Sequence, residues 1–258
     1  MSALLALPGR PAPAQAPVGT WLKIPAVEPA EIAAFAGFDF VVVDLEHAPL
    51  SVETAARMVT VAALAGVAPL VRVPDHGAAT VQRVLDAGAH GVLVPHVDTV
   101  DEAAAVAGAA RFPPRGRRGA GGTSRAGLWG MRPTAEYVAF GDDQALVVPQ
   151  LESERAVAAA ADILAVDGVD AVFVGAADLG LSAGLAPGDP ALAQMVDHVL
   201  AAAARAGKPC GLAVGADARA GAAAAARGAG FVMLANDSTL LAHAAREIVR
   251  EYRGAPSR

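Results

Sequence analysis

Short, continuous apolar runs alternate with longer alanine-rich stretches along most of the chain. The runs are rich in valine and leucine and are not interrupted by polar residues at every second position. This is typical of strands buried on both faces of a parallel sheet. The runs predict strands over residues 18–24, 38–44, 68–73, 91–97, 146–151, 170–175, 210–214 and 231–236.

The alanine-rich stretches between these runs predict helices over residues 29–36, 52–65, 78–87, 100–111, 154–165, 190–206, 216–227 and 239–252. Glycine follows five of them, where a residue with positive φ commonly ends a helix; these are Gly37, Gly66, Gly88, Gly207 and Gly228. Alternation of eight strands with eight helices indicates the α/β class and a (β/α)₈ TIM barrel. A doubly wound open sheet is the alternative.

No break in composition separates a second domain, so residues 18–258 are predicted to form one barrel domain. Residues 1–17 are rich in proline and alanine and are expected to be a flexible leader. The longest irregular segment, residues 112–133, contains five arginines and six glycines, which is typical of a functional or mobile loop.

The composition excludes several classes of protein. An apolar content of 54% is too high for a disordered chain, and a single cysteine excludes a disulfide-stapled domain. A net charge of −6 does not favour a nucleic-acid partner. No apolar run is long enough to cross a membrane, so no membrane association and a cytoplasmic location are expected.

Ionisable residues follow several of the predicted strands, at the end where barrel enzymes carry their chemistry. Glu152 and Asp178 end neighbouring strands, and two adjacent carboxylates without a nearby lysine favour a divalent cation with oxygen ligands. Two solvated loop carboxylates are the alternative. Asp44 and His47 lie three residues apart at another strand end, a spacing that can orient an imidazole as a general base.

Two further residues leave alternatives open. Arg72 lies in a predicted buried strand and needs a partner, which is either a substrate carboxylate or a structural ion pair with Asp44 or Glu46. His96 lies at the end of the fourth predicted strand and either faces the cavity or is held by Asp98 and the next helix.

Lysine is scarce: Lys23 and Lys208 stand against eighteen arginines. A mechanism through a Schiff base needs a buried lysine at a strand end. Lys208 precedes a strand, and no pattern indicates that Lys23 is buried near a base. The scarcity therefore favours a metal-assisted mechanism over a Schiff base.

Six segments together resemble one family over nearly the whole chain from Gly19. They are FDFVVVDLEHAP (38–49), LVRVP (70–74), VQRVLDAGAHGVLVPHVDTVDEA (81–103), RFPPRGRRGAG (111–121), PQLES (149–153) and VDGVDAVFVGAADLGLSAG (166–184). The chain resembles the HpcH/HpaI aldolases, the metal-dependent class II pyruvate aldolases related to citrate lyase β subunits. The resemblance implies a barrel that exchanges its last helix with a neighbour, in a homohexamer built as a trimer of dimers.

The resemblance also assigns roles to residues. It implies that Glu152 and Asp178 are ligands of Mg²⁺, Mn²⁺ or Co²⁺ and that Arg72 touches the bound keto acid. His47 matches the catalytic histidine, with Asp44 as its partner.

The same resemblance implies that Gln150 lies beside the metal and that backbone amides near Ala176 and Ala177 hold the substrate carboxylate. Here the chain has Gly-Ala-Ala-Asp where the family more often has Gly-Pro-Ala-Asp, and Asp-Leu-Glu-His where many members have glycine or threonine in second place.

The implied reaction is reversible cleavage of a 4-hydroxy-2-oxo acid to pyruvate and an aldehyde. The substrate would be a 2-keto-3-deoxy sugar acid or resemble 2,4-dihydroxyhept-2-ene-1,7-dioate. A Claisen-type lyase or synthase acting on citrate or on malyl or citryl thioesters is one alternative. A barrel that binds a ligand without catalysis is the other.

Overall fold

The computed structural model describes residues 15–254, so most of the expected leader lies outside the described residues. The strands are β1 (Val18–Leu22), β2 (Phe40–Asp44), β3 (Ala68–Arg72), β4 (Gly91–Val94), β5 (Leu146–Leu151), β6 (Val172–Val174), β7 (Cys210–Val214) and β8 (Phe231–Asn236). Each is parallel to the next, and β8 pairs with β1 to close the ring. The barrel prediction is confirmed, and the open sheet is wrong.

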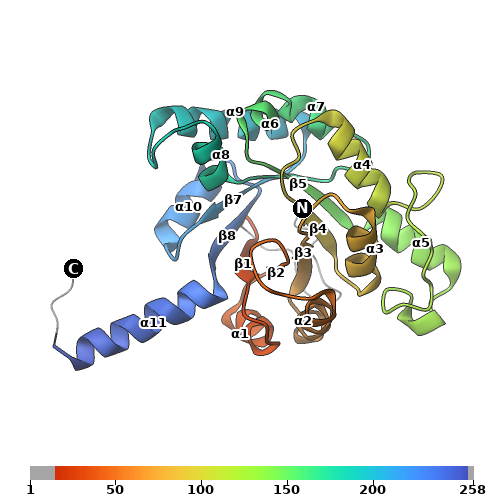
Figure 1. Cartoon of the computed structure of the whole chain (residues 1–258), viewed down its shortest axis with the longest axis horizontal. Coiled ribbons are helices and arrows are strands. Elements are labelled where there is room, and N and C mark those ends of the chain that lie inside the picture. Colours follow the sequence, from red (N-terminus) through yellow and green to blue (C-terminus); the bar gives the residue numbers. More distant parts are fainter. Residues whose placement is uncertain (1–14, 255–258) are drawn as a thin grey trace.

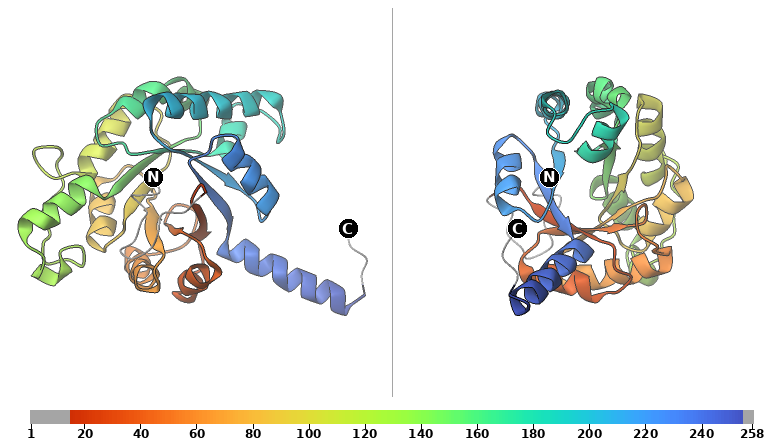
Figure 2. Two further views of the ribbon diagram at one scale, coloured as in Figure 1. Left: turned by 180° about the vertical axis from the view of Figure 1, so that it is seen from behind. Right: turned by 60° about the vertical axis from the view of Figure 1, so that its left-hand side comes forward.

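Helices surround the strands, as Figures 1 and 2 show. They are α1 (Glu28–Ala36), α2 (Val52–Ala65), α3 (Ala78–Asp86), α4 (Val100–Ala110), α5 (Thr134–Asp143), α6 (Glu154–Ala158), α7 (Ala160–Ala165), α8 (Ala176–Ser182), α9 (Pro190–Ala206), α10 (Ala218–Ala226) and α11 (Asp237–Tyr252), with a 3₁₀ turn η1 (Leu128–Gly130). All five glycines predicted to end helices have positive φ.

Three elements were not predicted, and each lacks a clear apolar pattern. Helix α5 buries only Tyr137 and Gly141, α8 is seven residues long, and η1 is a single turn. The predicted helix 154–165 is divided at Ala159, whose ψ of 0° interrupts it. The predicted strand 91–97 ends early because His96 has a φ of 54°.

Two apolar layers stabilise the barrel. Valine, alanine and leucine fill the space between strands and helices. The ring interior holds larger side chains, including Trp21, Phe173 and Phe231. Gly211 makes room for them, since a Cβ there would lie 2.2 Å from a ring carbon of Phe231. Four of the eleven aromatic residues fill this interior, namely Trp21, Phe40, Phe173 and Phe231.

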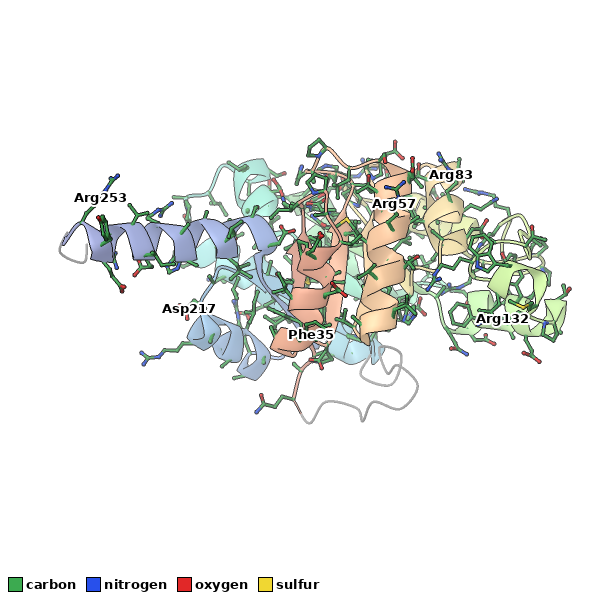
Figure 3. All side chains as sticks on the ribbon, turned by 90° about the horizontal axis from the view of Figure 1, so that it is seen from below. Phe35, Arg57, Arg83, Arg132, Asp217 and Arg253 are labelled. Atoms are coloured by element: carbon green, nitrogen blue, oxygen red, sulfur yellow. The ribbon has the colours of Figure 1, made fainter. Side chains whose placement is uncertain are left out.

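Helix α11 differs from the others because it leaves the barrel. It begins with a capping box between Asn236 and Thr239, then extends away from the rest of the molecule, with Arg253 beyond its far end (Figure 3). None of its residues is buried, and its exposed apolar side chains include Leu241, Ile248 and Tyr252. Within residues 15–254, none of the helices combines the length and apolarity that crossing a membrane requires.

Candidate active site

A cavity of about 230 Å³ opens at the carboxyl end of the barrel, where β1, β3, β5 and β6 finish. Its lining combines apolar rings from the barrel interior with charged and amide groups. It is formed by Trp21, Lys23, Arg72, Gln150, Phe173, residues 175–178, Ala213 and Asn236. This is the pole at which the sequence predicts the chemistry.

Arg72 is held in this cavity by two carboxylates and an aromatic ring. It faces Asp44 across the β2–β3 pair and donates to both oxygens of that residue, from Nε at 2.9 Å and from Nη2 at 2.6 Å. Its Nη1 lies 2.9 Å from Oε2 of Glu46, and its guanidinium stacks 4.2 Å from the centre of the Trp21 ring. Of the two partners predicted for Arg72, a substrate carboxylate or a structural ion pair, the structure therefore shows the ion pair, and it involves both Asp44 and Glu46.

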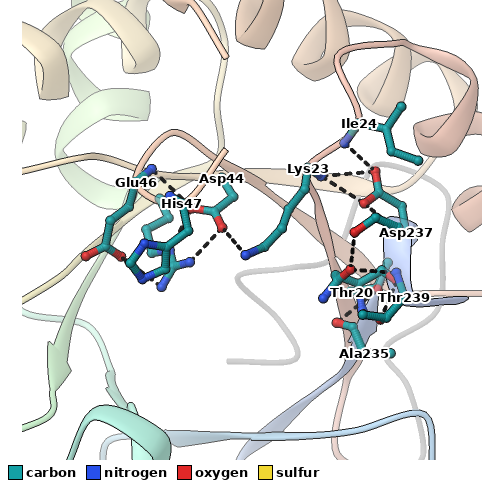
Figure 4. Close-up of polar contacts among 12 residues, drawn as sticks. Thr20, Lys23, Ile24, Asp44, Glu46, His47, Ala235, Asp237 and Thr239 are labelled. Atoms are coloured by element: carbon teal, nitrogen blue, oxygen red, sulfur yellow. Dashed lines mark hydrogen bonds and ion pairs between the residues drawn. The ribbon is translucent and has the colours of Figure 1, made fainter. Parts of the chain in front are cut away.

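Asp44 is fully buried and saturated with donors. Besides Arg72, it accepts hydrogen bonds from the backbone amides of Glu46 and His47, and the Nζ of Lys23 lies 3.1 Å away (Figure 4). Burial alone would raise its pKa, but the hydrogen bonds and charge of Arg72, with the other donors, hold the pKa below the ordinary value. Asp44 is therefore a fixed anion.

His47 does not share the Asp44 carboxylate in the way its sequence spacing predicts. Only its backbone amide contacts Asp44, at 3.2 Å. The imidazole is half exposed, and its Nε2 lies 3.6 Å from Oε2 of Glu46. The prediction that Asp44 orients the ring of His47 is therefore wrong, because Arg72 and Lys23 already contact that carboxylate. Glu46 is the acid that lies beside the ring.

Glu152 is the centre of a second polar group. Its Oε1 lies 2.7 Å from both the backbone nitrogen and the Nδ1 of His96, and its Oε2 accepts from the amide of Gln150. The Nε2 of His96 lies 3.2 Å from Oε1 of Glu46. Burial raises the pKa of Glu152 and outweighs the hydrogen bonds from His96 and Gln150.

Asp178 lies in the first turn of α8 and lines the cavity together with Ala176 and Ala177. It does not belong to the compact group that the structure forms around Glu152. That group offers one ligand atom each from Glu46, His96 and Glu152, all within 4.8 Å of one another. Of the predicted metal pair, Asp178 therefore lines the cavity, whereas Glu152 lies behind its lining residue Gln150 with two additional donors beside it.

The residues present suit a divalent cation. Glu152 is a buried carboxylate whose ionised form is disfavoured in this structure, and a cation would stabilise it. The Oε1 of Gln150 is buried and has no hydrogen-bond partner among the described residues. Buried oxygen atoms of this kind are the donors that Mg²⁺ and Mn²⁺ prefer.

Three residues of the site were missed or underrated by the sequence. Glu46 follows Asp44 by two positions and so shares its side of the strand end. Lys23 follows the inward-facing Trp21 by two positions, and this spacing would have indicated that its side chain points into the barrel mouth. Its backbone N–H donates to Oδ1 of Asp237 at 3.0 Å (Figure 4). His96 has its backbone turned by a positive φ, which no local pattern indicates.

Comparisons with known proteins agree with this geometry. The family model described as HpcH/HpaI aldolase/citrate lyase matches residues 18–244. A 4-hydroxy-2-oxovalerate aldolase of Rhodococcus jostii is 42% identical over 73% of this chain and 72% of its own length. A hydroxypyruvate/pyruvate aldolase of Chromohalobacter salexigens is 37% identical over 92% of this chain and 93% of its own.

The structural comparison gives the same result. The crystal structure of an HpcH/HpaI aldolase/citrate lyase family protein from Burkholderia cenocepacia has a TM-score of 0.87 and 35% identity, and the match covers 93% of this chain and 95% of that one. The aldolase relatives support a carbon–carbon lyase, which disfavours the barrel without catalysis. The chain belongs to the HpcH/HpaI aldolase/citrate lyase family.

Proposed function

We propose that the protein cleaves 4-hydroxy-2-oxo acids reversibly to pyruvate and an aldehyde, with a divalent cation held by Glu152 and Asp178. The observation that carries the proposal is the fixed guanidinium of Arg72 in a small cavity beside the buried carboxylate of Glu152. The positive charge of the guanidinium favours an anionic substrate, and the small volume of the cavity limits that substrate to a few carbon atoms. When bound, the metal supplies Lewis-acid stabilisation of negative charge on a keto oxygen.

Arg72 binds the oxygen that gains charge. Two of its five N–H groups are used on Asp44, and Nη1 faces Glu46. The N–H groups left over are available to the keto acid. Because both acids hold the guanidinium in place, little reorganisation is needed when charge develops, which is the condition for effective electrostatic catalysis.

The first turn of α8 binds the substrate carboxylate. The backbone amides of Ala176 and Ala177 precede the first intrahelical hydrogen bond of this helix, so they have no helical acceptor. Both residues line the cavity. Gln150 keeps Glu152 in position through its side-chain amide.

His47 moves the proton. It takes the proton of the 4-hydroxyl while the C3–C4 bond breaks, the hydroxyl carbon becomes the aldehyde, and the electron pair moves toward the 2-oxo oxygen. Protonation of C3 then completes pyruvate. Its half-exposed ring lies beside Glu46, which pairs with Arg72 of the cavity lining. A general base of this kind contributes about 10²–10⁴-fold.

Release of pyruvate from 4-hydroxy-2-oxo acids tests the proposal. Purified protein should release pyruvate with Mg²⁺, Mn²⁺ or Co²⁺ and stop when EDTA is added. Activity that survives EDTA, or borohydride trapping of pyruvate on Lys23, would contradict the metal-assisted mechanism. Cleavage of citrate or of malyl or citryl thioesters without any aldolase activity would favour the Claisen-type alternative.

We also propose that α11 docks on a neighbouring copy in a homohexamer. The apolar side chains that this helix exposes, with 67% of Ile248 and 63% of Leu241 accessible, support a partner surface in the assembly. Light scattering should give a mass of six chains, and a monomer would contradict the exchange.

A further inference from the structure

His96 stands between two carboxylates at the end of β4. Its φ of 54° belongs to the left-handed region, which non-glycine residues adopt rarely and histidine more readily than most. With this backbone, its amide nitrogen and its Nδ1 both lie 2.7 Å from the same oxygen, Oε1 of Glu152. A strained backbone beside a buried acid is a common sign of a functional position.

The other side of the imidazole is also held. Nε2 lies 3.2 Å from Oε1 of Glu46, whose second oxygen is anchored by Arg72 at 2.9 Å. A proton on Nε2 is therefore stabilised by Glu46, while Nδ1 lies at hydrogen-bond distance from Oε1 of Glu152 and shares with it a proton that a bound cation would displace. Histidine ligands of metal ions show this arrangement: one nitrogen faces the metal, and the other donates to a carboxylate.

We propose that His96 supplies a nitrogen ligand to the cation held by Glu152 and that Glu46 is the acid that orients it. The proposal rests on the proposed function, because it takes Glu152 to be a metal ligand. Neighbouring ligands with bonds near 2.1 Å stand about 3.0 Å apart, so Nδ1 and Oε1 need to separate by only a few tenths of an ångström. The imidazole is 65% exposed, so this shift disturbs no packing.

A nitrogen donor changes which metal the site prefers. Sites made only of oxygen suit Mg²⁺ and Ca²⁺, whereas imidazole favours the later first-row divalent ions. The structure therefore predicts that this chain binds Co²⁺ or Ni²⁺ markedly more tightly than Mg²⁺, and that His96 increases this difference.

Metal titration of the full, chelator-stripped chain at one neutral pH tests this. His96→Asn is the appropriate variant, because asparagine also tolerates the left-handed backbone. We expect it to lose roughly 10–100-fold in Co²⁺ affinity by calorimetry while its Mg²⁺ affinity stays nearly constant. His198→Asn, on the exposed surface of α9, is the matched control and should bind both ions as the wild type does.

Pulsed electron paramagnetic resonance of the Mn²⁺-loaded wild-type chain gives a second readout that needs no variant to fold. We expect the modulation of an imidazole nitrogen, lost in His96→Asn. Unchanged Co²⁺ affinity in the variant, or a wild-type spectrum without this modulation, overturns the role of His96. Loss of Mn²⁺ and Co²⁺ binding in Glu152→Gln supports the proposed metal site separately, whereas a wild-type chain that binds no divalent ion overturns both proposals.

Discussion

Replacing Asp44 with asparagine removes the charge that holds Arg72. The carboxylate is completely buried, and the Arg72 side chain is only 6% exposed. Asparagine keeps the shape and one acceptor oxygen but places an N–H₂ group among donors from Arg72 and Lys23. One buried positive charge is then left with Glu46 alone.

Removing one partner of a buried ion pair costs about 3–5 kcal/mol. The retained oxygen of asparagine and the second acid, Glu46, place the expected loss near the lower end, at about 3 kcal/mol. For a chain of this length, that corresponds to a fall in the melting temperature of roughly 6–12 °C.

The pH dependence of folding stability gives a second, independent test of the Asp44–Arg72 pair. Burial would raise the pKa of Asp44, but Arg72 and the other donors hold it below the ordinary value of 3.8. The folded chain is then harder to protonate than the unfolded one. The stability that Asp44 provides is therefore complete above pH 3.8 and is lost as the pH falls through the folded pKa. As the pH falls below 3.8, the wild type should therefore lose stability more steeply than Asp44→Asn.

Thermal unfolding of metal-free protein measures both effects. Glu53→Gln is the matched control, because this exposed carboxylate also pairs with an arginine, Arg57, but in solvent. Its expected change is only about 0–1 kcal/mol. If the melting temperature of Asp44→Asn fell no further than that of Glu53→Gln, Asp44 would not be the counter-charge of Arg72.

The other predictions concern the barrel core, the metal ligand and the base. Gly211→Ala should destabilise the fold by about 1–3 kcal/mol through overpacking against Phe231, whereas Gly215→Ala, which has open space, should be nearly neutral in denaturation. In EDTA, burial raises the pKa of Glu152, so acidification from pH 7 to pH 4.5 should remove a charge penalty from the wild type but not from Glu152→Gln; the stability of the wild type relative to this variant should therefore rise as the pH falls, and a difference that does not change with pH would refute it. His47→Ala should lower kcat about 10²–10⁴-fold with unchanged metal affinity in calorimetry; full activity would exclude it as the base.

The fold is readily predicted because its signals are local and repeated. Doubly buried strands have no polar alternation, and glycine at a positive φ ends helices such as α2 and α9. Where a signal is absent, prediction fails. Helix α5 buries too few residues to show a period, and β4 stops early because of one backbone angle at His96.

The pole of the barrel that carries the site was predictable, but the pairing of its side chains was not. Asp44 and Glu46 lie two positions apart, and either could have met Arg72. The β2–β3 register sets Asp44 directly opposite Arg72, and Glu46 reaches the same guanidinium from beyond the strand end. The partners of Glu152 likewise depend on side-chain directions from three separate strand ends, which spacing along the chain does not contain.

The central claim is that a catalytic cation is held at the barrel mouth beside Arg72. Crystals grown with Mn²⁺ and pyruvate and measured at the manganese absorption edge test it directly. We predict an anomalous peak between the carboxylates of Glu152 and Asp178, with pyruvate within reach of Arg72. An ordered pyruvate in this cavity without such a peak, or a peak elsewhere on the chain, would contradict the account.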